Sequence, residues 1–338
     1  MYREIYDTLD KNGKVKTAHI LTGPDAGRKY LVKDGSAEDM GNNLLCSVPG
    51  KEIREKYKDE VLKCQETCVL HEKDADIFVE IFEKNPHLVI LGGGHVSVPV
   101  CKIGKMLGFY VTVMDDREEF LTKERFPDAD RLVKGTFEEI TEKIPPYENA
   151  YYVIVTRGHM GDSICARQIL RRPYAYLGMI GSKNKIKITR HKLLGEGFTE
   201  KQLDSLHAPI GLPIGGQMPA EIAVSIMAEI VQEKNRNHVS YTDEKVEKAI
   251  KDGKNGTMMT IISKSGSSPR GVGSKMFLDR DGISYGSIGG GNVEYQASLY
   301  APKAADTEVV KYNLSSQGEG NLGMICGGTV EVLFERII

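Results

Sequence analysis

The stretch His87–Asp116 constrains the fold of this 338-residue chain more than any other part of its sequence. The short apolar run Leu88–Leu91 suits a strand that is buried on both faces. Three consecutive glycines follow it, and residues 98–107 then carry apolar side chains at a spacing typical of a helix packed on a sheet. Residues 110–114 form a second apolar strand. This order predicts a parallel α/β sheet with a sharp turn before its first helix.

Two acids stand at the carboxyl end of the second strand, where a dinucleotide-binding fold places the carboxylate that bonds a ribose hydroxyl. A helix N-terminus attracts phosphate because its N–H groups are unpaired, and glycines let the diphosphate approach the backbone. An acid at this place repels a 2′-phosphate, so we expect an NAD-type ligand rather than an NADP-type one. The alternative is a Rossmann-like sheet whose ligand site is vestigial. The residues expected at the nucleotide site are Gly92, Gly93, Gly94, His95, Asp115 and Asp116.

Further strand candidates at 132–133, 152–155 and 176–180 alternate with helical stretches, which indicates a doubly wound parallel sheet. Polar loops follow two of these strands, and ligands of open α/β sheets bind beyond the carboxyl ends of strands. Helix capping is the alternative role for the acid in the first loop and the serine in the second. The binding candidates in the two loops are His159, Asp162, Ser182 and Lys183.

Composition excludes several classes of protein. A net charge of −2 does not indicate the excess of positive charge that is typical of nucleic-acid-binding proteins. The apolar run at 222–231 is too short to span a bilayer and contains an acid. The first residues lack the apolar segment of a signal peptide, and six scattered cysteines do not form a disulfide framework. We therefore expect a reduced, cytoplasmic protein with no membrane association.

Cys64, Cys68 and His71 fall at a spacing that could ligate a metal if residues 58–71 form a helix. The sequence shows no fourth ligand, and free cysteines are often simply buried apolar side chains. Both interpretations stay open at this point.

The chain divides into three units. Residues 1–83 indicate a small α+β unit, 86–234 the Rossmann-like unit, and 240–338 a second α+β unit. Short strand candidates, helices and glycine turns fill both outer units.

The two outer units are related by an internal repeat. Residues 16–35 match the layout of 258–282, and 76–83 match 329–336. The first copy lacks three loops that the second copy has, so we expect one copy to be a scaffold and the other to carry the chemistry. Such units commonly bury apolar faces against each other, which predicts a homodimer, although the two copies could instead pair within one chain.

The three loops of the C-terminal unit read GSSPRGVG, SIGGGNVE and ICGG. Hydroxyls and a guanidinium in the first suit an oxyanion, and three glycines before a helix in the second suit an anion as well. The glycines of the third would leave a thiol approachable. The alternatives are ordinary turns and a buried cysteine. The candidates are Ser267, Ser268, Arg270, Gly289, Gly290, Gly291, Glu294, Cys326, Gly327 and Gly328.

These motifs resemble the XdhC/CoxI family, whose members are accessory proteins for the maturation of xanthine dehydrogenase and related molybdenum hydroxylases. The resemblance rests on GSSPRGVGSKM, GSIGGGNVE and CGGTVEV in the C-terminal unit. LGGGHVSVPV, TRGHMGD, AYLGMIGSKNK and IGLPIGGQMPAEIAVSIMAEI resemble the family's Rossmann domain. The resemblance covers residues 86–338, and reaches 1–83 only through the repeat.

The sequence departs from the family pattern in three ways. The intact CoxI-type unit follows the Rossmann domain instead of preceding it. Asn292 stands where the family's glycine turn commonly has cysteine, and Pro213 stands where it often has aspartate. Because the family's cysteines are implicated in holding the molybdenum cofactor, the resemblance leaves Cys326 as the matching candidate for a ligand of molybdenum.

The resemblance implies a maturation factor that binds molybdenum cofactor (molybdopterin), protects it during sulfuration and delivers it to an apo-hydroxylase. Its partners would be a xanthine dehydrogenase-type hydroxylase and a cofactor sulfurase. On this interpretation the protein is a cofactor-binding chaperone more than a catalyst. The alternatives are an NAD(P)-dependent oxidoreductase that uses the Rossmann domain and a pure interaction scaffold.

Overall fold

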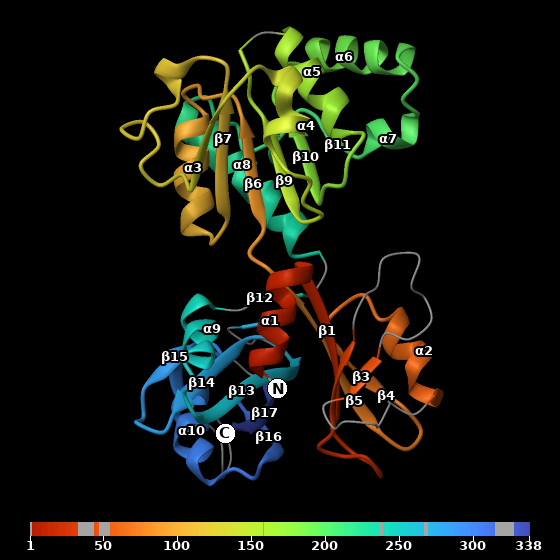
Figure 1. Ribbon diagram of the computed structural model, residues 1–338, viewed down its shortest axis with the longest axis vertical. Coiled ribbons are helices and arrows are strands. Elements are labelled where there is room, and N and C mark those ends of the chain that lie inside the picture. Colours follow the sequence, from red (N-terminus) through yellow and green to blue (C-terminus); the bar gives the residue numbers. More distant parts are fainter. Residues whose placement is uncertain are drawn as a thin grey trace. The chain divides into compact units, whose positions relative to one another are not determined.

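The computed structural model describes most of the chain (Figure 1). The described residues are 2–32, 44–46, 55–157, 159–236, 239–241, 243–266, 270–314 and 328–338. Contacts divide the chain into two compact units. One combines Met1–Lys84 with Asn237–Ile338, so the two ends of the sequence fold together, and the other is Asn85–Arg236.

The central unit contains the predicted parallel sheet. Its strands are β6 (His87–Leu91), β7 (Tyr110–Asp115), β8 (Arg131–Lys134), β9 (Ala150–Ile154), β10 (Tyr176–Met179) and β11 (Leu206–His207). All neighbouring strands are parallel, in the order β11-β10-β9-β6-β7-β8. The order reverses at β6, which is the arrangement of a Rossmann fold. The prediction of fold class is therefore confirmed.

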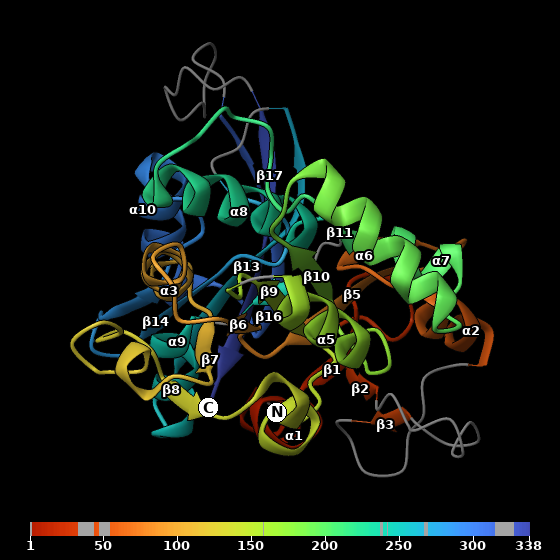
Figure 2. The ribbon, with the colours of Figure 1, turned by 90° about the horizontal axis from the view of Figure 1, so that it is seen from above.

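Helices cover both faces of this sheet because its central strands are apolar on both sides. On one face lie α3 (Ser97–Met106) and α8 (Pro219–Lys234). On the other lie α4 (Ile140–Lys143), α5 (His159–Ile169), α6 (Lys183–Gly195) and α7 (Glu200–Asp204). Helix α7 contacts the edge strand β11. Figure 2 shows α3 and α8 on one side of the sheet and α5 and α6 on the other. No helix in the described ranges is long and apolar enough to cross a membrane.

The other unit contains two mainly antiparallel sheets, one from each end of the chain. The first has the order β12-β5-β1-β2-β3, with β4 also paired to β5. Its elements are α1 (Tyr2–Asn12), β1 (Lys14–Ile20), β2 (Lys29–Val32), β3 (Leu44–Cys46), α2 (Glu55–Lys63), β4 (Cys68–His71), β5 (Asp76–Glu83) and β12 (Ser240–Tyr241). The prediction of a helix over 58–71 is wrong beyond Lys63, because residues 68–71 pair with β5 as a strand.

The second sheet has the order β15-β14-β13-β17-β16. Its elements are α9 (Glu244–Lys251), β13 (Gly256–Ser265), β14 (Lys275–Asp279), β15 (Ser284–Gly286), α10 (Gly291–Tyr300), β16 (Thr307–Asn313) and β17 (Thr329–Ile337). Amphipathic α9 buries one face on this sheet, and the charged face stays outside.

The two sheets are copies of one motif. In both, a central strand lies between a hairpin partner and a long C-terminal strand: β2-β1-β5 in the first and β14-β13-β17 in the second. Gly27 and Gly273 precede the hairpin partners with φ of 84° and 87°, and they donate hydrogen bonds to Ile20 and Ile261 in turn. The internal repeat seen in the sequence is therefore a structural repeat.

The strand registers give the residue equivalences of the repeat. Lys29 lies opposite His19, as Lys275 lies opposite Thr260. The residues two positions before His19 in β1 and two positions before Thr260 in β13 lie opposite Glu80 and Glu335 in turn. Glu80 is therefore equivalent to Glu335. The match of 76–83 with 329–336 inferred from the sequence is thus two residues out of register.

The two copies pair with each other inside one chain through crossed, buried ion pairs. Lys29 of the first copy binds Glu335 of the second at 2.9 Å, and Lys275 of the second binds Glu80 of the first. Because Lys29 is equivalent to Lys275 and Glu80 to Glu335, the pairs are related by a pseudo-two-fold axis. All four residues are buried. The copies therefore meet within the chain, which was the alternative to the predicted homodimer.

Candidate functional site

The glycine turn after β6 has a backbone that only glycine adopts without strain. Gly92 has φ of 114°, and a Cβ placed on it would lie 2.5 Å from the carbonyl oxygen of Val155. Ser97, which replaces the third glycine of the fingerprint, is buried and donates its hydroxyl to the Gly92 carbonyl at 2.5 Å. Gly94, in contrast, faces open space among the described residues. The turn is therefore rigid at Gly92 and accessible at Gly94.

Asp115 supports this turn instead of facing a ligand. Its buried carboxylate accepts hydrogen bonds from the Gly93 amide at 2.6 Å and from the Arg117 guanidinium at 2.9 and 3.0 Å. Burial raises the pKa of Asp115, but the hydrogen bonds from Arg117 and Gly93 outweigh it and lower this pKa to about 2. A carboxylate with these partners has little left to offer a ribose.

Asp116 is the exposed member of the pair. Partial burial and the neighbouring Asp115 raise its pKa. Beside it, the Arg117 guanidinium stacks 3.8 Å from the centre of the Phe120 ring. The role of Asp116 in binding a ribose stays a prediction, and Arg117 is a nearby cation that the sequence reasoning left out.

The two polar loops of the sheet prove to contain helix-capping and packing groups. Asp162 is buried, accepts hydrogen bonds from the backbone and hydroxyl of Thr156, and forms an ion pair with Lys185. Ser182 caps α6 by accepting from the Lys185 amide at 3.4 Å. Lys183 is exposed, and His159 is described only as the first residue of α5. Their expected role in binding a cofactor stays a prediction.

The three loops of the C-terminal copy leave the second sheet at one end. Ser265, at the end of β13, lies opposite Thr329, at the start of β17, and their hydroxyl oxygens are 2.8 Å apart. Asn313, at the end of β16, lies opposite the same threonine. Gly286, at the end of β15, lies opposite Met276 near the start of β14. The strand ends from which the three loops extend therefore lie at the same end of the sheet.

The glycine turn SIGGGN already holds an anion of its own chain. Gly289, Gly290 and Gly291 have φ of 122°, 70° and 63°. The Glu294 carboxylate accepts from the Ser287 hydroxyl at 2.6 Å and from the amides of Ile288 and Gly290 at 3.1 and 2.9 Å. These donors, expected to cradle a ligand anion, are occupied by Glu294 instead.

Several candidates of the other two loops lie outside the described residues. These are Ser267, Ser268, Cys326 and Gly327. Arg270 is exposed, and Gly328 is buried and accepts a hydrogen bond from the Leu314 amide at 2.8 Å. The loops that contain Arg270 and Cys326 extend from the paired residues Ser265 and Thr329, and the expected roles of Cys326 and Arg270 in binding a cofactor stay predictions.

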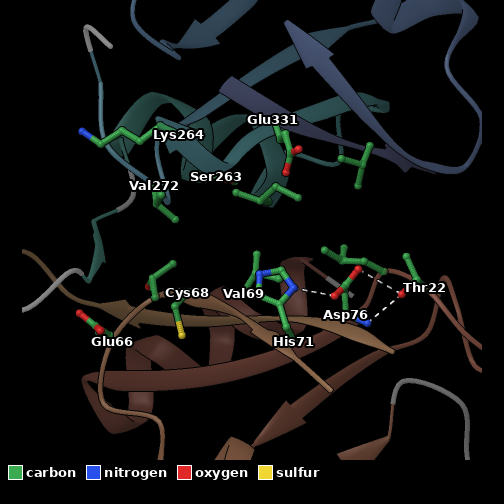
Figure 3. A pocket seen from close by; sticks show the side chains of 14 residues that line it. Thr22, Glu66, Cys68, Val69, His71, Asp76, Ser263, Lys264, Val272 and Glu331 are labelled. Atoms are coloured by element: carbon green, nitrogen blue, oxygen red, sulfur yellow. Dashed lines mark hydrogen bonds and ion pairs between the residues drawn. The ribbon is translucent and has the colours of Figure 1, made fainter. Parts of the chain in front are cut away.

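A pocket of about 470 Å³ lies between the two sheets of the repeat (Figure 3). Its lining comes from both copies and includes Cys68, Asp76, Ser263 and Glu331. Ser263 pairs with Glu331 two positions before the Ser265–Thr329 pair, so the pocket adjoins the end where the loops leave. The sequence reasoning missed this pocket, because it forms only when strands from opposite ends of the chain face each other.

Cys64 and Cys68 do come together, with 3.3 Å between their sulfur atoms. Burial and the hydrogen bond with Cys64 raise the pKa of Cys68 to about 12. His71 instead bonds Asp76 at 2.7 Å. No group of three or more metal-binding side chains gathers within the described ranges.

Comparison with known proteins matches two parts of the chain to family models. Residues 88–230 match the XdhC Rossmann domain, and residues 249–313 match the XdhC and CoxI family. An uncharacterised protein of Escherichia coli, YqeB, is 32% identical over 160 residues, which are 47% of this chain and 29% of that protein. A Bacillus subtilis protein described as a probable xanthine dehydrogenase subunit is 29% identical over 165 residues, 49% of this chain and 48% of that one.

The chain thus spans less than half the length of both curated relatives. Among solved structures, one described as a xanthine dehydrogenase from Bacillus halodurans superposes with a TM-score of 0.54 at 23% identity. It covers 68% of this chain and 65% of that one, which shows a shared fold. With both family models in the order Rossmann domain then CoxI-type unit, the chain belongs to the XdhC and CoxI family.

Proposed function

We propose that this protein is an accessory factor of a xanthine dehydrogenase-type molybdenum hydroxylase. It binds molybdenum cofactor as cargo, shields it while a sulfurase acts on it, and passes it to the apo-hydroxylase. Family membership and the names of the Bacillus relatives support the choice of partner.

The observation that carries the proposal is that the strand ends from which the three family loops extend lie at one end of the second sheet. The pocket beside that end has a volume within the range of small-molecule sites, about 300–1,000 Å³. Its lining offers apolar walls at Val69, Ile262 and Val309, and polar groups at Ser263 and Glu331. A pterin has flat apolar faces and a polar edge, so the lining fits that part of the cofactor.

Molybdenum and the pterin phosphate need other groups. The Cys326 thiolate would be a soft ligand for the metal, and Arg270 would bind the phosphate. Glu294 accepts the hydrogen bonds of its own glycine turn. That turn would therefore shape the site and not supply hydrogen-bond donors to the cofactor.

Replacing Cys326 with serine tests the ligand set. Serine keeps the size of the side chain but replaces a soft donor with a hard one, so most of the bound molybdenum should be lost while the fold remains. Protein purified from a host that makes the cofactor is denatured, and released pterin is measured by fluorescence and molybdenum by mass spectrometry. Cys101→Ser, at a buried cysteine of α3, is the control and should keep its cofactor. A full complement of cofactor in Cys326→Ser would make Cys326 structural.

A second function is favoured by one observation in the central unit. Gly94 faces open space at the N-terminus of α3, whose first turn contains no acid. Binding of an NAD-type nucleotide there would make the protein an NAD(P)-dependent oxidoreductase or give the accessory factor a nucleotide-controlled unit. Release of a bound pterin when the protein is denatured would distinguish the accessory role from that of a pure dehydrogenase.

The repeat does not require a homodimer for either function. The surfaces that were expected to be buried in a homodimer are already paired within the chain by the ion pairs Lys29–Glu335 and Lys275–Glu80.

A further inference from the structure

The pocket between the two sheets contains equivalent residues from both copies. Asp76 begins β5 and its equivalent Glu331 lies at the same register position of β17, because Phe78 and Leu333 are equivalent. Val69 of β4 and Val309 of β16 lie opposite Phe78 and Leu333 in turn, so they too are equivalent. All four of Asp76, Glu331, Val69 and Val309 line the pocket. The pocket therefore lies on the pseudo-two-fold axis that relates the copies.

The two equivalent carboxylates have different surroundings. Asp76 is held by His71 at 2.7 Å, and the Thr22 hydroxyl lies 3.4 Å from its other oxygen. Glu331 has Lys311 on the neighbouring strand, but the charged atoms are 3.9 Å apart and the Lys311 side chain is 65% exposed. Among the described residues, Glu331 therefore keeps the carboxylate with more capacity to accept hydrogen bonds from a ligand. Figure 3 shows it reaching into the space between the sheets.

Five of the residues that line the pocket with Glu331 are aliphatic. Leu21 and Val69 come from the first copy, and Ile262, Val272 and Val309 from the second. Such walls suit the faces of a flat ring, and burial between them excludes water from the hydrogen bonds at its edge. Lys264, at the rim, is a cation suited to an anionic substituent that extends from the ring.

A carboxylate between aliphatic walls is complementary to one kind of ring edge. The aminopyrimidinone edge of a pterin presents a ring N–H and an amino group side by side, and two carboxylate oxygens accept both in parallel, as they do from a guanidinium. An edge with a carbonyl in place of the amino group would place one hydrogen-bond acceptor against another, because the carbonyl oxygen would face a carboxylate oxygen. The same edge occurs in guanine, so guanine nucleotides share this chemistry.

We propose that the pocket on the pseudo-two-fold axis binds the aminopyrimidinone edge of a pterin through the Glu331 carboxylate. This rests on the proposed function and gives its cargo a specific binding site. The second copy supplies the carboxylate that binds, and the first copy, through Val69 and Leu21, supplies part of the opposite wall. The first copy, which lacks the three loops, is then part of the binding site and not only a scaffold.

The test uses the full chain, produced in a host that makes no molybdopterin, and follows the fluorescence of free pterin during titration. Wild-type protein should bind pterin, and should bind lumazine, which has a carbonyl in place of the 2-amino group, at least tenfold more weakly. Glu331→Gln keeps the shape but loses the charge and one acceptor, so pterin affinity should fall roughly 10- to 100-fold. Glu83→Gln, which makes the same change of charge at the other end of β5 and outside the pocket lining, is the control and should change affinity by less than about threefold.

Equal binding of pterin and lumazine, or unchanged affinity in Glu331→Gln, would overturn the assignment. So would tighter binding of guanosine monophosphate than of pterin, which would give the pocket to a nucleotide. The two proposals fail differently. If the chain from a cofactor-producing host carries pterin but Glu331→Gln carries as much, only the location is wrong, whereas a chain that never carries pterin refutes the proposed function.

Discussion

Replacing Lys29 with methionine should lower the free energy of unfolding of the repeat unit by about 3–5 kcal/mol. The side chains of Lys29 and Glu335 are 3% and 9% exposed, and their charged atoms lie 2.9 Å apart. Methionine is similar in length, so packing is retained, but Glu335 is left as a buried charge whose remaining partners among the described residues are the Tyr2 hydroxyl and His19. The desolvation of that charge is then uncompensated, which is the physical source of the loss.

Two controls make this prediction specific. Lys14 forms a surface pair with Glu83 at 3.2 Å, and Lys14→Met should cost no more than about 1 kcal/mol. The double variant Lys29→Met/Glu335→Leu removes both charges and should recover much of the stability. Urea unfolding followed by hydrogen exchange of β17 reports on this unit alone. A loss below about 1 kcal/mol in Lys29→Met would show that the crossed ion pairs do not hold the two copies together.

The same pair makes the stability depend on pH. Burial raises the pKa of Glu335, but Lys29 and His19 outweigh it and hold this pKa well below its usual range. A carboxyl group whose pKa is lower in the folded than in the unfolded chain stabilises the fold above the unfolded pKa, about 4.3. That stabilisation is lost as pH falls from this value through the lowered folded-state pKa. In Glu335→Leu this part of the acid dependence should disappear.

Replacing Gly92 with alanine should lower the free energy of unfolding of the central unit by about 2–4 kcal/mol. A side chain at φ of 114° is strained, and the added Cβ would lie 2.5 Å from the Val155 carbonyl oxygen and 2.8 Å from its carbon. Both are backbone atoms of the strand end next to β6, so neither can move without disturbing the sheet. For a unit of this size the midpoint of thermal unfolding should fall by roughly 5–15 °C.

Gly94→Ala is the matched control, two residues away in the same turn. Its φ is not in the left-handed region, and nothing in the described residues would contact the added Cβ. The midpoint should therefore stay within about 2 °C of that of the wild type. If calorimetry gives the two variants the same midpoint, the tight turn at Gly92 is not what positions α3.

The central sheet was predictable from sequence because each of its strands is a local signal. Leu88–Leu91 and 152–155 are short apolar runs, and buried parallel strands are apolar on both faces. The turn and helix between β6 and β7 follow from the glycines and from helical spacing in one short stretch of chain. The short strands β3, β4 and β15 were not predicted, because strands of three or four residues carry little periodicity.

Contacts between distant residues could not be inferred from the sequence. The spacing that suggested a ribose ligand also suits Asp115 as the support of Gly93, and only the hydrogen bonds distinguish the two. Glu294 likewise satisfies the glycine turn that it was expected to leave open. The equivalence of Glu80 with Glu335 follows from the strand registers. The sequence does not show it, because β13 contains a bulge and because the sequence match between the two copies is two residues out of register.

Delivery of the cofactor is tested by following its transfer to a hydroxylase. Chain loaded with molybdenum cofactor is mixed with a xanthine dehydrogenase-type hydroxylase purified without its cofactor, and hydroxylase activity and the distribution of pterin are followed together. We expect pterin to move to the hydroxylase and activity to appear in proportion to the loaded chain, with no gain from the cofactor-free chain. Pterin that stays on the chain, or activity that rises equally with the cofactor-free chain, would contradict a role in cofactor delivery.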